Sequence, residues 1–237
     1  MQERYLGDSH DFIKYALLRR IHQQCCLDIG LNWYLTCPEE LGEAENGDGE
    51  KRHHLKGGVW HSWDAELLKS LNFFSDTNQR EISKFESSGI LPESCVFYGD
   101  HVPVEERLNW HKKALEDLNQ SDFVFLDPDN GFIVKSATKS RKRKYAIYPE
   151  VADYFRSGQT VCSIQFARQC DPIKKANAVR NALSMEAGVP INFPVLRGRV
   201  APNILFVFLP QPQHEATLLS ALEDFCHDSG GKAELIF

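Results

Sequence analysis

The segment Asp127-Pro128-Asp129-Asn130 brings two carboxylates and an amide together within four residues. Carboxylate and amide oxygens accept hydrogen bonds from a substrate amine, and carboxylates also bind hard cations such as Mg²⁺. The same residue types favour a simple turn as well. Position favours the functional interpretation, because the segment directly follows the apolar run Asp122 to Leu126, which is typical of a buried central strand. We therefore predict that these four residues take part in catalysis.

Polar residues also follow two other apolar runs. Thr36 stands at the end of one run, and Asp100 with His101 follows another. An acidic, glycine-rich segment, Glu39 to Gly58, comes after Thr36 and shows no helical or strand periodicity, so we expect a long surface loop there. Ligands of an open α/β sheet bind beyond the carboxyl ends of its strands. These three strand ends are therefore the places to look for chemistry.

A basic cluster follows the D-P-D-N-G segment immediately. Its members are Lys135, Lys139, Arg141, Lys142, Arg143 and Lys144, in a chain whose formal net charge is -6. This local reversal of sign suits contacts with the phosphates of RNA or DNA, which we assign to Lys139 and to the run from Arg141 to Lys144. A block of like charges is also typical of a solvated loop without a partner.

Composition excludes several classes of protein. The chain has 237 residues, of which 42% are hydrophobic and 25% charged, as in ordinary globular proteins, so disorder, collagen and coiled coil are excluded. No apolar run approaches the roughly 18 residues that a membrane helix needs. The seven cysteines form no C-x-x-C pair, which disfavours a disulfide framework or a zinc ribbon. Since Met1 to Asp8 lacks the pattern of a secretory signal, we expect a cytosolic protein with no membrane partner.

The spacing of apolar residues predicts the elements that position these groups. Period-2 or unbroken apolar runs indicate strands, and recurrence at three and four residues indicates helices. We expect strands at Ile29 to Thr36, Cys95 to Tyr98, Asp122 to Leu126, Gly158 to Phe166, Asn192 to Leu196, Asn203 to Leu209 and Ala233 to Phe237. We expect helices at Asp8 to Gln23, Asp64 to Phe74, Gln79 to Ser87, Val104 to Leu118, Pro149 to Arg156, Pro172 to Ala187 and Glu215 to His227.

Helices and strands alternate until the last third of the chain, which is typical of the α/β class. We therefore predict a three-layer α/β/α sandwich with a mainly parallel sheet and an antiparallel C-terminal part. No linker or shift in composition divides the chain, so we expect one domain over residues 1–237. In this arrangement Asp127 lies at the carboxyl edge of a central strand.

At two places the sequence resembles a known family. The opening helix G-D-x-x-x-F-I-K-Y-A-L-L-R and the later F-L-D-P-D-N-G resemble Rossmann-like methyltransferases that use S-adenosylmethionine, most of all the adenine-N6 methyltransferases of large-subunit ribosomal RNA. The sequence is more similar still to a set of uncharacterised bacterial proteins with G-D-x-x-K-Y-x-L-L-R and F-L-D-P-D-N-G. The likeness covers Gly7 to Gln169. It implies a Rossmann-like fold, S-adenosylmethionine as cofactor and an adenine amine in nucleic acid as target.

The resemblance also implies roles for residues. Asp127 and Pro128 match the start of the D-P-P-Y motif, in which a side chain and a backbone carbonyl accept hydrogen bonds from the target amine. Asp129 and Asn130 replace its second proline and its aromatic residue, which leaves Phe132 as the nearest stacking surface. Cofactor contacts are implied for Lys14, Thr36, Gly47, Asp48, Gly49 and Asp100. The D-x-G-x-G turn of the family is absent after the first strand.

Two other functions remain open from the sequence. A metal-dependent phosphoesterase or nuclease would use Asp127 and Asp129, with His101, as ligands of Mg²⁺ or Mn²⁺. No second D-x-D, E-x-K or H-x-H completes such a ligand set, so we assign no metal site. The other alternative is a derivative of the methyltransferase fold that binds nucleic acid without catalysis.

Overall fold

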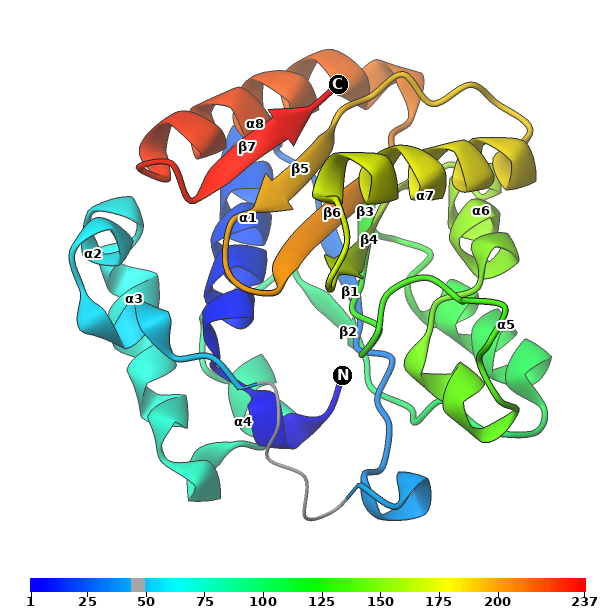
Figure 1. Cartoon of the computed structure of the whole chain (residues 1–237), viewed down its shortest axis with the longest axis horizontal. Helices are drawn as coiled ribbons and strands as arrows, with labels where there is room; N and C mark the ends of the chain where they lie inside the picture. Colours follow the sequence, from blue (N-terminus) through cyan, green and yellow to red (C-terminus); the bar gives the residue numbers. More distant parts are fainter. Residues whose placement is uncertain (44–49) are drawn as a thin grey trace.

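The apolar runs of the sequence pair into one sheet at the centre of the molecule (Figure 1). A computed structural model describes residues 1–43 and 50–237. Within these residues, seven strands lie in the order β2-β1-β3-β4-β6-β5-β7. Their bounds are β1 Ile29–Asn32, β2 Val96–Tyr98, β3 Phe123–Leu126, β4 Thr160–Ala167, β5 Val195–Gly198, β6 Asn203–Leu209 and β7 Ala233–Ile236.

The sheet is parallel in its first part and antiparallel in its last part. Strands β2, β1, β3 and β4 run parallel, whereas β6 is antiparallel to both β4 and β5, and β7 is antiparallel to β5. Asn32 at the end of β1 pairs in register with Leu126 at the end of β3, so these two strands end level with each other. The predicted α/β class and the Rossmann-like arrangement with an antiparallel C-terminal part are confirmed.

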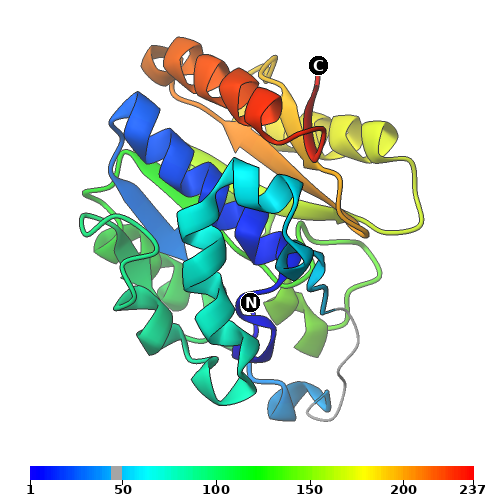
Figure 2. The ribbon, with the colours of Figure 1, turned by 90° about the vertical axis from the view of Figure 1, so that its left-hand side faces the viewer.

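Helices cover both faces of the sheet, which produces the three layers. Figure 2 shows α1 and α8 side by side on one face and α7 on the other, and α6 packs against α7 and β4. The short helices α2, α3 and α4 lie outside α1 (Figures 1 and 2). The bounds are α1 Ser9–Cys25, α2 Val59–Trp63, α3 Ala65–Leu71, α4 Ile82–Glu86, α5 Arg107–Asp117, α6 Tyr148–Arg156, α7 Pro172–Ala187 and α8 Glu215–Asp228. Among the described residues, no helix has the length and apolar character needed to cross a bilayer.

The first strand ends earlier than predicted. Its ladder stops at Asn32 instead of Thr36, because the Asn32 side chain accepts a hydrogen bond from the Tyr34 N–H and Tyr34 adopts a φ of 47°. This local turn withdraws Tyr34 and the residues after it from the sheet. Strand β5 begins at Val195, three residues later than predicted, and Pro194 just before it has no N–H to give to a ladder.

The predicted loop from Glu39 to Gly58 has more structure than its sequence indicates. Short 3-10 helices form at Glu39–Leu41 and at His53–Lys56, and the His54 side chain is buried against Ser9 at the start of α1. Residues 44–49 lie outside the described residues, and with them the cofactor contacts predicted for Gly47, Asp48 and Gly49.

Candidate functional site

The carboxyl ends of β1 and β3 form the switch point of the sheet. From β1 the chain continues to β2 on one side and then crosses to β3 on the other, so the direction of strand order reverses between β1 and β3. Ligands of open α/β sheets bind in the crevice at such a point. Asp127 follows β3 directly, and its N–H donates to the Asn32 carbonyl at 3.0 Å. The D-P-D-N-G segment therefore begins at the carboxyl edge of a central strand, as predicted, and this edge is the switch point of the sheet.

Lys14 of α1 reaches the same edge and pairs with Asp127. Its Nζ lies 2.7 Å from Asp127 Oδ2 and 2.6 Å from Asp11 Oδ1. No more than 5% of any of these three side chains is exposed. Burial alone would lower the pKa of Lys14, but the two carboxylates outweigh it and hold that pKa above its usual value. Lys14 is therefore a buried cation clamped between two acids.

A second pair of groups completes this buried cluster at the start of α1. The Asp8 carboxylate caps the helix by accepting from the N–H groups of His10 and Asp11, and it lies 3.4 Å from His10 Nδ1. Asp11 accepts a hydrogen bond from the Gly7 N–H at 2.8 Å. The pKa of Asp11 is raised to about 6; burial is the largest cause, Lys14 opposes the rise, and the charge of Asp8 adds to it. The cluster thus contains three carboxylates around one lysine.

The raised pKa of Asp11 predicts a pH-dependent stability. A carboxyl whose folded-state pKa exceeds its ordinary 3.8 stabilises the fold below pH 3.8, and this contribution is lost as the pH rises through about 6. Urea unfolding of the native chain and of Asp11→Asn should therefore give free energies of unfolding whose difference moves in favour of the variant between pH 4 and pH 7. A difference that stays constant, or moves the other way, would show that Asp11 is charged throughout.

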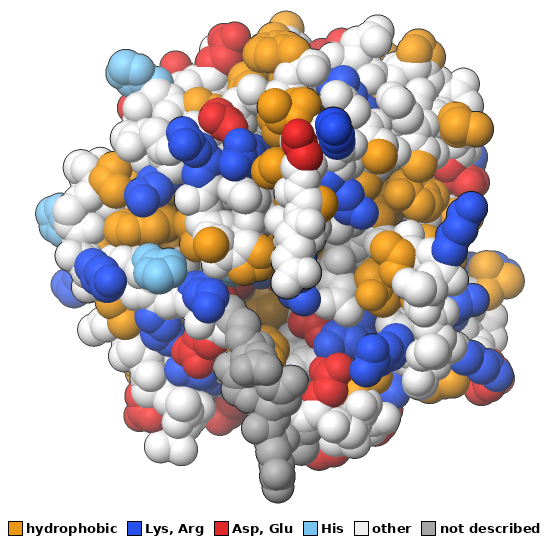
Figure 3. Space-filling model, in the orientation of Figure 1, with side chains coloured by type: hydrophobic (Ala, Val, Ile, Leu, Met, Phe, Trp, Pro, Cys, Tyr) orange, Lys and Arg blue, Asp and Glu red, His pale blue; other side chains and the backbone are white. Residues whose placement is uncertain are grey.

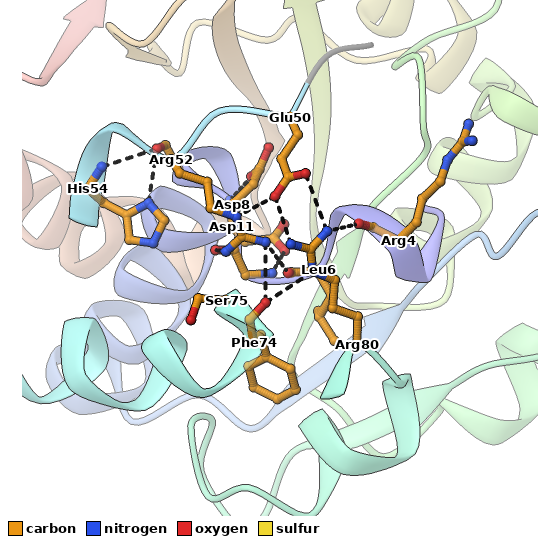
Figure 4. A network of polar contacts seen from close by, with 12 residues as sticks. Arg4, Leu6, Asp8, Asp11, Glu50, Arg52, His54, Phe74, Ser75 and Arg80 are labelled. Atoms are coloured by element: carbon orange, nitrogen blue, oxygen red, sulfur yellow. Dashed lines mark hydrogen bonds and ion pairs between the residues drawn. The ribbon is translucent and has the colours of Figure 1, made fainter. Parts of the chain in front are cut away.

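Two arginines fix the segment that leads into α1 (Figure 4). Arg52 donates to the carbonyls of Leu6, Gly7 and Phe74, and Arg80 donates to the carbonyls of Arg4 and Phe74. Both guanidinium groups also pair with Glu50. Because these contacts satisfy backbone carbonyls ahead of the helix, they set where α1 begins and hence where Lys14 points.

The first two residues occupy the space between the ends of β1 and β3. The Met1 backbone nitrogen donates to the carbonyls of Tyr34 at 2.8 Å and Asp127 at 3.1 Å, and the Thr36 N–H donates to the Met1 carbonyl at 3.0 Å. Gln2 is fully buried. Thr36 Oγ1 and Gln2 Oε1 are buried and have no hydrogen-bond partner among the described residues. The crevice is therefore closed over Asp127, with two polar atoms unsatisfied inside it.

The rest of the D-P-D-N-G segment faces a different cation. The Asp129 carboxylate lies 3.0 Å from Lys144 Nζ, and the Asn130 N–H donates to the Lys144 carbonyl at 2.8 Å. Asp127 and Asp129 thus pair with separate lysines. Within residues 1–43 and 50–237, no group of three or more His, Cys, Asp or Glu side chains could hold a metal ion. Phe132 is buried in a stacked contact with Tyr148, so it offers no stacking surface in this conformation.

The basic segment divides into an inner and an outer part. It forms the 3-10 helix Ser140–Lys144, in which Arg143 is buried against Glu40, and Lys144 pairs with Glu43 as well as Asp129. Lys139 pairs with the exposed Glu105 at 2.6 Å. The side chains of the outer part are exposed and have no carboxylate partner among the described residues; they are Lys135, Arg141 and Lys142. The outer part is the portion that can contact phosphates directly.

Asp100 and His101 lie beyond the end of β2, the outermost strand on that side of the sheet. Both are exposed, and the Asp100 carboxylate pairs with Lys113 at 2.6 Å. No contact links Asp100 to Asp127 in the described structure. The structure therefore brings Lys14, Thr36 and Asp127 to the switch point but leaves Asp100 with a partner of its own.

Sequence reasoning missed two residues of the site. Asp11 is one of them, although its spacing of three residues from Lys14 on a helix was a usable signal. Gln165 is the other, a polar residue within the apolar strand β4, whose Oε1 accepts from the Phe132 N–H at 3.0 Å. It thereby fixes the turn after Asn130.

Comparison with known proteins adds no assignment. No protein-family model matches the chain, and no curated protein matches it at a significant level.

Proposed function

We propose that the chain is a methyltransferase-like protein that uses S-adenosylmethionine and acts on an amine of a nucleic-acid base. The observation that carries this proposal is the position of Asp127 and Pro128, directly after β3 at the switch point of a Rossmann-like sheet. The outer basic residues Lys135, Arg141 and Lys142 follow in the same connection and supply positive charge for phosphates.

The chain's own residues suit the holding of an amine. S-adenosylmethionine would supply the methyl group. The carboxylate of Asp127 is an acceptor for amine hydrogens, and Lys14, bonded to its Oδ2, fixes the orientation of that carboxylate. Asp11 in turn pairs with Lys14 at 2.6 Å, so the Asp127 carboxylate is supported by the first turns of α1.

In the described conformation, residues 1 and 2 cover the switch point at which the cofactor would bind. Met1 and Gln2 fill the crevice, and Asp127 is only 2% exposed. The unsatisfied Thr36 Oγ1 is the one group of the predicted cofactor set that lacks a partner within the described residues. Binding at the switch point therefore requires residues 1 and 2 to leave the space between Tyr34 and Asp127.

The closed crevice favours a second candidate, a methyltransferase fold that binds nucleic acid without catalysis. In that case the Lys14 and Asp127 pair is structural, and the exposed cations carry the function. The two candidates differ in one measurable property, which is affinity for the cofactor.

Thermal unfolding with added cofactor tests the proposal. S-adenosylmethionine or its homocysteine product at 100 times the dissociation constant stabilises a protein by about 2.7 kcal/mol. For a chain of this length that corresponds to a rise in melting temperature of roughly 5–10 °C. ATP, which shares the adenosine, is the matched control and should give a smaller shift.

Transfer of a labelled methyl group from S-adenosylmethionine to RNA and DNA oligonucleotides completes the test. A melting shift together with transfer supports the enzyme. No shift with either cofactor form, while nucleic acid still binds, overturns the proposal and leaves the non-catalytic candidate.

A further inference from the structure

Unpaired cations gather on both sides of the D-P-D-N-G segment. On one side are Lys135, Arg141 and Lys142. On the other, beyond the end of the neighbouring strand β4, are Arg168 and Lys174, which are exposed and have no carboxylate partner in the described part of the chain. Figure 3 shows Lys and Arg side chains, together with some Asp and Glu side chains, around the hollow near the centre of its view. In a chain of net charge -6, this distribution favours a polyanion that crosses the carboxyl edge of the sheet.

Arg168 differs from the other cations because it lies on an aromatic ring. Its guanidinium carbon is 5.1 Å from the centroid of Phe166, and its side chain is exposed. The Phe166 ring also contacts the His10 ring edge-on, with 5.3 Å between the ring centroids. His10 is in turn held in place by a 2.9 Å contact between its Nε2 and the Pro202 carbonyl. The guanidinium carbon therefore lies over a ring that is itself held in place, and the guanidinium group has no polar partner among the described residues.

The register of the sheet places Arg168 away from Asp127, where the target base would be held. Leu126 pairs with Ser163, so Asp127 is level with Ile164, and Arg168 comes four residues later. At about 3.3 Å per residue, Arg168 lies roughly 13 Å further out along the strand direction. That separation is too long for the base that Asp127 would hold, and it suits a base further along the same strand of nucleic acid.

We propose that Arg168, held over the Phe166 ring, binds an unpaired base of a single-stranded nucleic acid that flanks the base presented to Asp127. Arginine planes and aromatic rings stack on the faces of unpaired bases without regard to sequence. Lys174 and the outer basic residues contact the phosphates on either side. The inference rests on the proposed nucleic-acid substrate and names it as single-stranded.

Fluorescence anisotropy with labelled ten-nucleotide strands tests this assignment. The probes are single-stranded DNA and RNA of mixed sequence, the DNA strand as a duplex, and an abasic strand of the same length. Arg168→Lys keeps the charge and loses the plane, so affinity for the single strands with bases should fall about tenfold. Affinity for the abasic strand should stay within about twofold, because phosphate contacts are kept.

Two further variants separate charge from stacking. Lys174→Ala removes a cation assigned to a phosphate, so it should reduce the slope of log affinity against log salt by about one. Arg156→Ala removes the same charge at the end of α6, which leads into the start of β4 and so lies at the opposite edge of the sheet, and it should leave binding unchanged.

Each result has a defined reading. Equal weakening of the abasic strand by Arg168→Lys, or tighter binding of the duplex than of the single strand, overturns the stacking role. Unchanged binding by Arg168→Lys, when the native chain binds, overturns this inference alone. If the native chain binds none of the probes, the nucleic-acid partner of the proposed function fails too, whereas cofactor affinity is measured separately. Comparison of the affinities for the DNA and RNA single strands shows which sugar the protein prefers.

Discussion

Lys14→Met is expected to lower the free energy of unfolding by about 3–5 kcal/mol, because it leaves two buried carboxylates without a counter-ion. Lys14 lies within 2.7 Å of both Asp11 and Asp127, and all three side chains are almost completely buried. Methionine fills a similar volume, so the loss reports charge and not packing. Urea unfolding at pH 7, followed by circular dichroism, measures the change.

Lys113→Met provides the matched control for this experiment. Lys113 lies 2.6 Å from Asp100, but more than half of each side chain is exposed. Solvated pairs of this kind contribute about 0–1 kcal/mol. The double variant Lys14→Met with Asp11→Asn should recover part of the lost free energy of unfolding, since one of the two uncompensated carboxylates has been removed. If both single variants lose the same small amount, the cluster at α1 does not stabilise the fold.

Gly131→Ala is the second substitution with a large expected effect, a loss of about 3 kcal/mol from backbone strain and overpacking together. Gly131 has a φ of 84°, a region that alanine avoids. A Cβ there would also lie 2.8 Å from Cα of Gln165, and backbone of a central strand cannot yield cheaply. Thermal unfolding with fitted enthalpies gives the change in stability.

Gly158→Ala separates the two causes of that loss. Gly158 has a φ of 91°, but a Cβ there meets no atom within 4 Å. The Gly158→Ala substitution should therefore lower the free energy of unfolding through backbone strain alone, by about 1–2 kcal/mol. The excess of the Gly131→Ala loss over the Gly158→Ala loss measures how tightly the D-P-D-N-G turn packs on β4. Equal losses would mean that this turn is free to adjust.

Local patterns in the sequence were sufficient to predict the sheet. The run Asp122 to Leu126 and the strand Asn203–Leu209 are short, apolar and bounded by proline or polar residues, so their burial follows from their own composition. Because parallel strands share a carboxyl edge, the position of Asp127 followed from the strand alone. Ser9–Cys25 was visible for the same reason, since its buried residues recur at helical spacing.

The partners of the charged residues could not be predicted in this way. Nothing in the sequence near Lys14 indicates Asp127, and nothing near Arg143 indicates Glu40, because these pairs form only when distant segments meet. A run of Lys and Arg residues gives the same sequence pattern whether the side chains face solvent or the interior. The closing of the crevice by Met1 and Gln2 depends on backbone hydrogen bonds, which side-chain patterns do not record.

The pairing of Lys14 with Asp127 also orders events during synthesis. The two residues are 113 positions apart, so at about 5–20 residues per second the ribosome adds the second roughly 6–23 s after the first. Throughout that interval Asp11, three residues away, is the counter-ion that the nascent helix itself provides. The contact between His10 and Pro202 spans 192 residues and closes later still. Helix α1 emerges well before the segments on which it packs, so it is among the last elements to reach its final surroundings, and such non-local closure slows folding.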